Sequence, residues 1–237
     1  MPARAIVGMY GWLRDIGDFF FPRCCMVCGR VLLHDEDFLC SHCLVGLPRT
    51  DYCSMPDNPM EQLFYGKLPV VHCAAYFFFA DGGDGRRLIH RIKYDGAKEC
   101  GAYLGNLFAR ENAVTGFFSG IDYIVPVPLH PHKLRRRGYN QSEWIAQGIA
   151  DATGIPLCTD LLECVTDKQS QTRKGIYDRW LSTHEAFEAH DGIVSSDAHV
   201  LLVDDVVTTG ATLLACGEAL RRVGINRLSI CALSLAK

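Results

Sequence analysis

Two adjacent carboxylates stand directly before a short loop of threonines near the C-terminus of the chain. Asp204 and Asp205 follow an apolar run that begins at His199, and the loop comprises Thr208, Thr209, Gly210, Ala211 and Thr212. The apolar run predicts a strand buried on both faces, and the spacing from Ala211 to about Val223 predicts a helix. The loop therefore precedes a helix N-terminus, where N–H groups and hydroxyls favour a phosphate. Carboxylates at the carboxyl end of an inner strand suit the vicinal hydroxyls of a ribose.

This stretch resembles the 5-phosphoribosyl-1-pyrophosphate (PRPP) motif of type I phosphoribosyltransferases, in which an apolar run, two aspartates and two further residues precede Thr-Thr-Gly-x-Thr. The resemblance implies that Asp204 and Asp205 are catalytic, because they hold the ribose hydroxyls and help an oxocarbenium-like cation to form. It also implies a PRPP site that includes Val206, Val207 and the loop 208–212, with the loop gripping the 5-phosphate.

A second strand, predicted over 121–128, ends in Pro126, Val127 and Pro128. We expect this turn to present backbone N–H groups to an anion. Four cations follow within five residues, namely Lys133, Arg135, Arg136 and Arg137. Next to the acidic pair, this basic loop could neutralise a pyrophosphate, which Arg137 steadies and Mg²⁺ bridges. The alternative is an exposed basic loop. Asn140 or Ser142 is expected to cap the helix that follows.

Cysteines near the N-terminus have the spacing of a metal site. Cys25 and Cys28 form one C-x2-C pair, and Cys40 and Cys43 form another after eleven residues. Four thiolates on two knuckles predict a closed, structural zinc site with no open position for a substrate. Cys24 or His42 could replace one of these ligands, and Cys53 is a more distant candidate.

The cysteine pairs, Pro-Val-Pro-Leu-His-Pro, Arg-Arg-Gly-Tyr-Asn-Gln and the Asp-Asp motif follow one another along the whole chain. In this order they resemble the ComF family of phosphoribosyltransferase-like proteins associated with competence, the uptake of DNA in bacterial transformation. The resemblance implies an N-terminal zinc module, a PRPP-type site and a link to single-stranded DNA. A further family segment is matched at Gln171, Thr172, Arg179 and Phe187, whereas Ser182 replaces the expected Asn. A closing lid and an exposed loop both fit this segment.

The elements that must position these residues predict an α/β fold. Strands and helices alternate from about residue 70, which favours a mostly parallel sheet with helices on both faces. We expect an N-terminal helix and double-knuckle, zinc-ribbon-like module over 1–56, a linker over 57–69, and a type I phosphoribosyltransferase-like domain over 70–237. The N-terminal helix, at 5–21, is expected to dock on the module. A helix near 86–94 carries Arg86, Arg87, Arg91 and Lys93, which we expect to face solvent; a phosphate-facing wall is the alternative.

Composition limits the partners. The formal net charge of −3 gives no global positive field, so any nucleic-acid site must be local. Arg135 and Arg136 are the candidate DNA-binding residues, and Tyr94, Tyr139 and Trp180 could stack bases. The sequence holds no apolar run long enough to cross a membrane and no secretory signal pattern, so we expect no integral membrane insertion and a cytoplasmic protein.

Three functions remain open at this point. The first is Mg²⁺-dependent transfer of phosphoribose from PRPP to an acceptor that the sequence does not name, since no general base is evident. The second is a non-catalytic, PRPP-sensing module that binds single-stranded DNA or DNA-processing proteins. The third is a salvage transferase for a free base.

Overall fold

The computed structural model describes residues 22–79, 83–165 and 187–236. The expected helix at 5–21 and most of the segment around Gln171, Thr172, Arg179 and Ser182 lie outside these residues. The chain divides into two compact units, Met1–Leu47 and Pro48–Lys237. Among the described helices, none has the length and apolar character needed to cross a bilayer.

The small unit is built around two cysteine-bearing turns. An antiparallel bridge joins Cys24 to Val31, and Gly29 closes the turn between them with a φ of 74°. Only a glycine adopts this left-handed conformation without strain. The second turn leads into the short helix α2 (Ser41–Val45), whose N-cap is Cys40. Both turns therefore bring sulfur atoms toward a common centre, as the spacing predicted.

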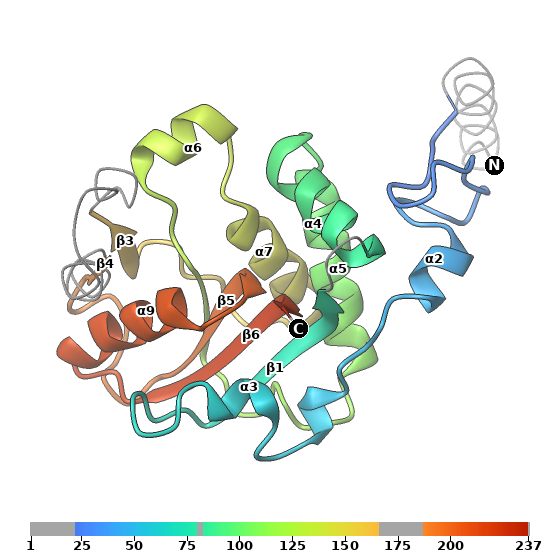
Figure 1. Cartoon of the computed structure of the whole chain (residues 1–237). Helices are drawn as coiled ribbons and strands as arrows, with labels where there is room; N and C mark the ends of the chain where they lie inside the picture. Colours follow the sequence, from blue (N-terminus) through green and yellow to red (C-terminus); the bar gives the residue numbers. More distant parts are fainter. Residues whose placement is uncertain (1–21, 80–82, 166–186, 237) are drawn as a thin grey trace, which may run out of the picture. The chain divides into compact units, whose positions relative to one another are not determined.

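The large unit contains a four-stranded parallel sheet in the order β1-β6-β5-β2 (Figure 1). The strands are β1 (His72–Phe79), β2 (Tyr123–Pro126), β5 (His199–Val207) and β6 (Arg227–Ala236). Nearly every residue of the two central strands is buried, which agrees with their continuous apolar sequences. The predicted parallel sheet is confirmed.

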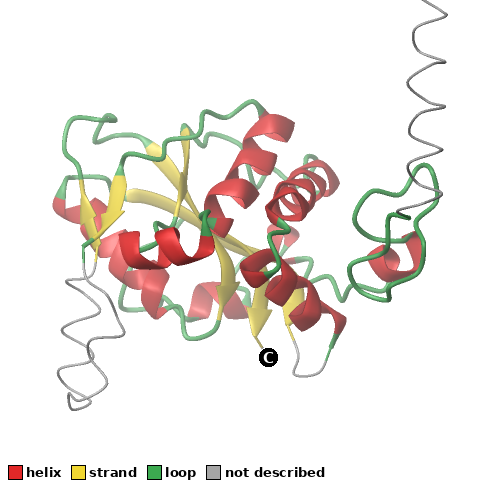
Figure 2. Cartoon of the chain, turned by 90° about the horizontal axis from the view of Figure 1, so that it is seen from above, coloured by secondary structure: helices red, strands yellow, loops and turns green. Residues whose placement is uncertain are grey.

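Helices cover both faces of this sheet (Figures 1 and 2). One face carries α4 (Asp84–Tyr94), α5 (Lys98–Glu111) and α7 (Gln141–Thr153); α9 (Ala211–Arg222) lies on the other. Helices α5 and α7 approach so closely at Gly148 that a Cβ atom added there would lie 1.9 Å from the carbonyl oxygen of Ala102. A small antiparallel ribbon of β3 (Leu162–Cys164) and β4 (Phe187–Ala189) packs beside α9.

The segment that we expected to be a basic loop is a helix, α6 (Pro131–Arg137). Pro131 occupies its first position, and the Nδ1 atom of His130 accepts a hydrogen bond from the His132 N–H. Gly138 ends the helix with a φ of 84°. Proline at the start and glycine just past the end are typical helix boundaries, so the loop expectation was wrong for a reason visible in the sequence.

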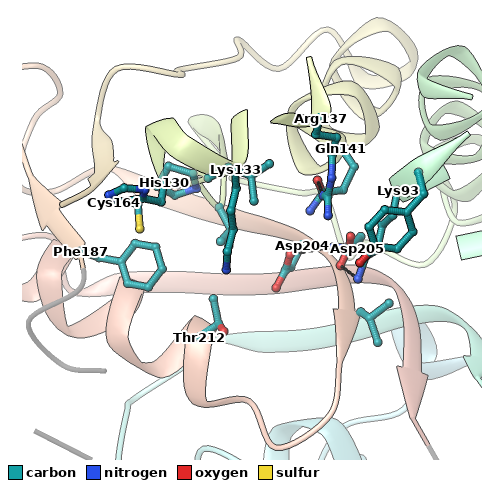
Figure 3. A pocket seen from close by; sticks show the side chains of 15 residues that line it. Lys93, His130, Lys133, Arg137, Gln141, Cys164, Phe187, Asp204, Asp205 and Thr212 are labelled. Atoms are coloured by element: carbon teal, nitrogen blue, oxygen red, sulfur yellow. Dashed lines mark hydrogen bonds and ion pairs between the residues drawn. The ribbon is translucent and has the colours of Figure 1, made fainter. Parts of the chain in front are cut away.

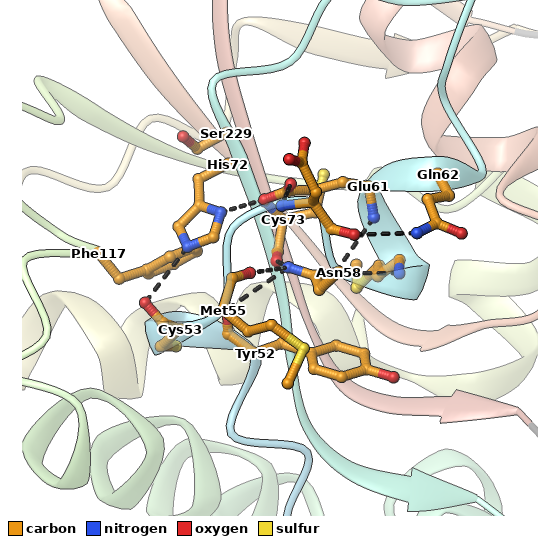
Figure 4. A network of polar contacts seen from close by, with 12 residues as sticks. Tyr52, Cys53, Met55, Asn58, Glu61, Gln62, His72, Cys73, Phe117 and Ser229 are labelled. Carbon is orange, nitrogen blue, oxygen red and sulfur yellow. Dashed lines mark hydrogen bonds and ion pairs between the residues drawn. The ribbon is translucent and has the colours of Figure 1, made fainter.

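Residues 48–69 fold against β1 as part of the large unit, and include η1 (Tyr52–Ser54) and α3 (Pro59–Gln62). The amide of Asn58 donates to the carbonyls of Met55 at 2.9 Å and Cys73 at 2.8 Å (Figure 4). The carboxylate of Glu61 accepts from the Cys73 N–H at 3.1 Å and contacts His72. These buried contacts attach the expected linker to the sheet, and the compact units divide at residue 47, before the expected boundary at residue 56.

Candidate functional site

The two carboxylates lie at the carboxyl end of β5, where its neighbour β2 stops. The last paired residues of these strands are Pro126 and Val203. Beyond them Asp204 and Asp205 are both buried. Oδ1 of Asp204 accepts from the Ser142 hydroxyl at 3.1 Å and from the Asp205 N–H at 2.9 Å. Oδ1 of Asp205 forms an ion pair with Nζ of Lys93 at 3.0 Å (Figure 3).

Two like charges in one buried place disfavour full ionisation. Burial raises the pKa of the Asp204 carboxyl, and the neighbouring charge of Asp205 raises it further, so that this pKa is about 7. The hydrogen bonds and the Lys93 charge oppose this rise. Oδ2 of Asp205 is buried and has no hydrogen-bond partner among the described residues. A buried oxygen of this kind calls for a donor or a cation, which a bound ligand or an ordered water can supply.

The acid pair opens onto a cavity of about 260 Å³ (Figure 3). Seven residues predicted from the sequence line it together, namely Asp204, Asp205, Val206, Thr212, Val127, Pro128 and Arg137. Other predicted residues are not part of its wall, namely Pro126, Val207, Thr208, Thr209, Gly210, Ala211, Arg135 and Arg136. The sheet edge therefore brings the two sequence motifs to one site.

The threonine loop reaches the cavity through its last residue. Gly210 takes a left-handed φ of 74° and precedes α9 directly, while Thr208 and Thr209 are exposed. Thr212, in the first turn of α9, lines the cavity. The first N–H groups of a helix lack partners within the helix, so this end of α9 supplies the expected positive pole.

Helix α6 divides its cations between two surfaces. Lys133 and Arg137 are four residues apart, share one helix face and line the cavity. Arg137 also contacts the side-chain oxygen of Gln141, and its Cζ lies 5.2 Å from the centre of the Tyr94 ring. Arg135 and Arg136 are exposed and do not line the cavity. Because this segment is a helix and not a loop, Lys133 and Arg137 lie on a different face from Arg135 and Arg136.

The turn 126–128 does not present a free N–H at Val127, contrary to our expectation. That N–H donates to the Val203 carbonyl at 2.9 Å, and the Val127 carbonyl accepts from the Asn140 amide at 3.0 Å. The two prolines have no N–H to offer. The turn instead contributes the walls of the cavity. Of the two residues expected to cap α7, Asn140 is the cap, and Ser142 contacts Asp204 instead.

Sequence reasoning gave no role to four lining residues from separate elements, namely Leu129, His130, Gln141 and Cys164. Lys133, Lys93, Tyr94 and Phe187 also line the cavity and had been named for other reasons, Lys133 as one of the cations expected to neutralise a pyrophosphate. Lys93 was expected to face solvent. It lines the cavity instead, which agrees with the alternative that this helix forms a wall near the site. Its position in the last turn of α4 gave no signal for pairing with Asp205. Phe187 was noted only as a family match, and Cys164 had no signal at all.

The four predicted cysteine ligands converge in the small unit. The sulfur atoms of Cys25, Cys28, Cys40 and Cys43 all lie within 4.8 Å of one another, and those of Cys28 and Cys40 are 3.7 Å apart. A tetrahedral site with metal–sulfur bonds of about 2.3 Å separates its sulfurs by about 3.8 Å. The cluster could therefore hold one metal ion, and none of Cys24, His42 or Cys53 is part of it.

The surroundings of this cluster shift the pKa values of two of its thiols in opposite directions. Burial opposes ionisation of Cys25, but N–H groups of Cys28, Cys40 and Val27 outweigh it and lower the thiol pKa to about 6. Burial raises the pKa of Cys43. Between the knuckles, Glu36 accepts from the N–H groups of Leu33 and Ser41 at 2.9 and 2.6 Å. These bonds lower the pKa of the Glu36 carboxyl to about 2 and fix the connection between the two cysteine pairs.

Comparison with known proteins agrees with the fold and the site. The family model of the phosphoribosyl transferase domain matches residues 121–237, which include both motifs of the cavity. The large unit is therefore a type I phosphoribosyltransferase fold.

Three relatives carry names that refer to competence or to DNA utilization. Competence protein F of Haemophilus influenzae is 32% identical over 48% of this chain and 50% of its own length. DNA utilization protein YhgH of Escherichia coli K12 is 28% identical over 87% of both chains. Competence protein ComFC of Streptococcus pneumoniae is 34% identical over 42% of both chains. The match thus spans half the length of the first relative, and these similarities support a ComF family protein.

Replacing Asp204 with Asn should stabilise the protein at alkaline pH. Asn keeps an acceptor for Ser142 and has no carboxyl to ionise. In the wild type the pKa of Asp204 is raised by folding, so the free-energy cost of ionising Asp204 in the folded protein grows as pH rises from about 4 to about 7. We expect Asp204→Asn to melt roughly 5 °C above the wild type at pH 8, and the difference to vanish near pH 4. Thermal melts across this pH range measure it.

Asp197→Asn is the matched control, because Asp197 is exposed. An equal gain in both variants, or a gain that persists at pH 4, would contradict the assigned strain between the two acids.

Proposed function

We propose that the large unit binds PRPP with Mg²⁺ and transfers its phosphoribosyl group to an acceptor. The observation that carries this proposal is the unpartnered, buried Oδ2 of Asp205 in a cavity that also contains Asp204 and three cations. An acceptor atom in this position suits a hydroxyl donor, and the paired carboxylates match a vicinal diol. The cations suit a ligand that is itself strongly anionic.

In this proposal, different residues of the cavity bind different chemical groups of PRPP. The acids Asp204 and Asp205 receive the ribose hydroxyls, and Thr212 at the start of α9 receives the 5-phosphate. Lys133 and Arg137 receive the pyrophosphate. Carboxylate and phosphate oxygens are the ligands that Mg²⁺ prefers, and the ion would supply charge neutralisation to the leaving group. The residues present fit such an ion.

The transfer breaks the bond between the ribose C1 and the pyrophosphate oxygen and forms a bond from C1 to the acceptor. Positive charge develops on the ribose ring, and the negative field of Asp204 and Asp205 stabilises it. The bonding electrons leave with pyrophosphate, whose added charge Arg137 and Lys133 offset. The acceptor stays unnamed, and a free base, as in salvage, is one member of the class to be tested.

Binding of PRPP should depend on the charge of the acid pair. Asp204→Asn removes a charged acceptor for the ribose, and such bonds contribute about 1.5–3 kcal/mol. We expect a roughly 10- to 100-fold weaker affinity for PRPP with Mg²⁺ by titration calorimetry. A pyrophosphate-release screen over free bases and nucleosides then asks whether bound PRPP turns over.

The same Asp204→Asn protein is expected to be more stable than the wild type, so lost binding cannot be assigned to unfolding. Asp197→Asn should bind as the wild type does. Wild-type protein without affinity for PRPP would refute the proposed function.

A second candidate function is a PRPP-sensing module that binds single-stranded DNA. The observation that favours it is the exposed pair Arg135 and Arg136 on α6, outside the cavity. Tyr94 is 59% exposed, lines the cavity mouth and stacks against His90 at 4.8 Å between ring centres. Cations beside an exposed aromatic ring suit a nucleic-acid strand. The relatives are named for competence and for DNA utilization, and we include in this proposal a role in DNA uptake with DNA-processing proteins as partners.

This candidate predicts separable sites. The double variant Arg135→Ala with Arg136→Ala should weaken binding of a fluorescent oligonucleotide and reduce its salt slope by up to about 2, since two phosphate contacts are lost. Its affinity for PRPP should stay unchanged. The double variant Arg221→Ala with Arg222→Ala, at the far end of α9, is the charge-matched control. Unchanged DNA affinity in the α6 variant would remove α6 as the DNA site.

We further propose that the ion of the small unit is zinc and that it is structural. Four cysteine sulfurs leave no position for a substrate, and the separation of Cys28 and Cys40 sulfurs fits tetrahedral coordination. Thiolate clusters of this kind persist where disulfides do not form, which supports a cytoplasmic location.

Metal analysis should find about one zinc per chain. Cys40→Ser removes a buried ligand, so we expect loss of the zinc and unfolding of the small unit, seen as rapid proteolysis within residues 22–47. Cys24→Ser changes an exposed thiol outside the cluster and should keep the metal. Wild-type protein purified without chelator and devoid of zinc would contradict this assignment.

A further inference from the structure

We propose that Lys93 is a positioning residue of the cavity: its ammonium holds one oxygen of Asp205 and leaves the other oxygen directed at the ligand. This inference rests on the proposed function and assigns a role to a residue outside both sequence motifs. Lys93 would act through Asp205 rather than on the reacting atoms.

The ion pair is well placed for this role. Nζ of Lys93 lies 3.0 Å from Oδ1 of Asp205, and the two side chains are 24% and 5% exposed (Figure 3). With Oδ1 engaged by the ammonium, Oδ2 is the carboxylate oxygen that has no partner among the described residues. Since Asp204 lies next in sequence and is also buried, the ammonium compensates one of two adjacent charges.

The backbone of Lys93 is held on both sides. Ile92 before it is fully buried, and its carbonyl accepts a hydrogen bond from the Tyr139 hydroxyl. Tyr94 after it packs under the guanidinium of Arg137. These contacts come from Arg137 at the end of α6 and from Tyr139 just after it, so the end of α4 is tied to the wall of the cavity. A lysine on a fixed backbone can place its charge reproducibly.

Other ionisable groups also face the acid pair and must be considered in its titration. They are His130, Lys133 and Arg137 at α6, Cys164 on β3 and Cys231 on β6. Lys133 and Arg137 are expected to pair with the anionic ligand. Lys93 already pairs with Asp205 before any ligand binds, so its removal should act chiefly on the acids.

Removing the ammonium should make ligand binding depend on pH. In Lys93→Met we expect Asp204 to ionise only at higher pH, because a compensating charge is lost beside two buried carboxylates. We expect the affinity for PRPP with Mg²⁺ to fall about tenfold or more at pH 7 and to recover toward pH 9. Lys93→Arg should stay within about threefold of the wild type at every pH, because it keeps the charge.

Arg91→Met is the matched control, since Arg91 is exposed on the same helix and does not line the cavity. Calorimetry at several pH values between 6 and 9 compares the four proteins. The proposal is overturned if Lys93→Met binds as the wild type does, if Arg91→Met shows the same change, or if the loss in Lys93→Met is equal at every pH. The last result would mean that Lys93 only contacts the ligand.

A second readout does not need PRPP. Carbon-13 NMR of the aspartate carboxyls should show the acid pair titrating at higher pH in Lys93→Met than in Arg91→Met. If the wild type fails to bind PRPP but this shift is present, the proposed function fails and the role of Lys93 stands. Absence of the shift overturns that role. Should Lys93→Met not fold, Tyr139→Phe, which removes the hydroxyl that donates to the Ile92 carbonyl, must move the titration in the same direction.

Discussion

The structure depends on the burial of two adjacent carboxylates at the end of one inner strand. Asp204 and Asp205 repel each other in a place that water does not screen, so this part of the sheet is stable only with compensating contacts. Ser142 from α7 and Lys93 from α4 supply them. The unfavourable repulsion lies at the same two carboxylates that the proposed ligand would contact. Natural proteins commonly accept such a loss of stability at a functional site.

The cavity is lined by residues from separate parts of the chain, within 93–94, 127–141, 164, 187 and 204–212. The end of α4, the turn after β2, helix α6 and the ribbon β3–β4 converge because parallel strands place all their carboxyl ends at one edge. A parallel connection cannot be local, so each crossover brings a new helix to this edge. On one face of the sheet, α5 and α7 pack against each other closely at Gly148.

The two compact units use different means of stabilisation. The large unit buries a sheet between helices, whereas the described part of the small unit, residues 22–47, buries few apolar side chains other than cysteine and gathers four cysteine sulfurs. Glu36 contributes to the small unit by accepting N–H groups from both sides of the connection between the knuckles. In the large unit, Asn58 and Glu61 have a similar task and attach the segment before β1 to the sheet.

The sequence alone determined the parallel sheet, the cysteine cluster and the acidic motif, because each follows from local spacing: a buried apolar run, two C-x2-C pairs and a strand–loop–helix. Proline and glycine also marked the ends of α6, although we expected a loop there. Only the tertiary structure decided that Lys93 pairs with Asp205, that α6 separates Arg137 from Arg135, and that Cys164 lines the cavity. These contacts join residues from different elements, and no periodicity along the chain records which elements meet.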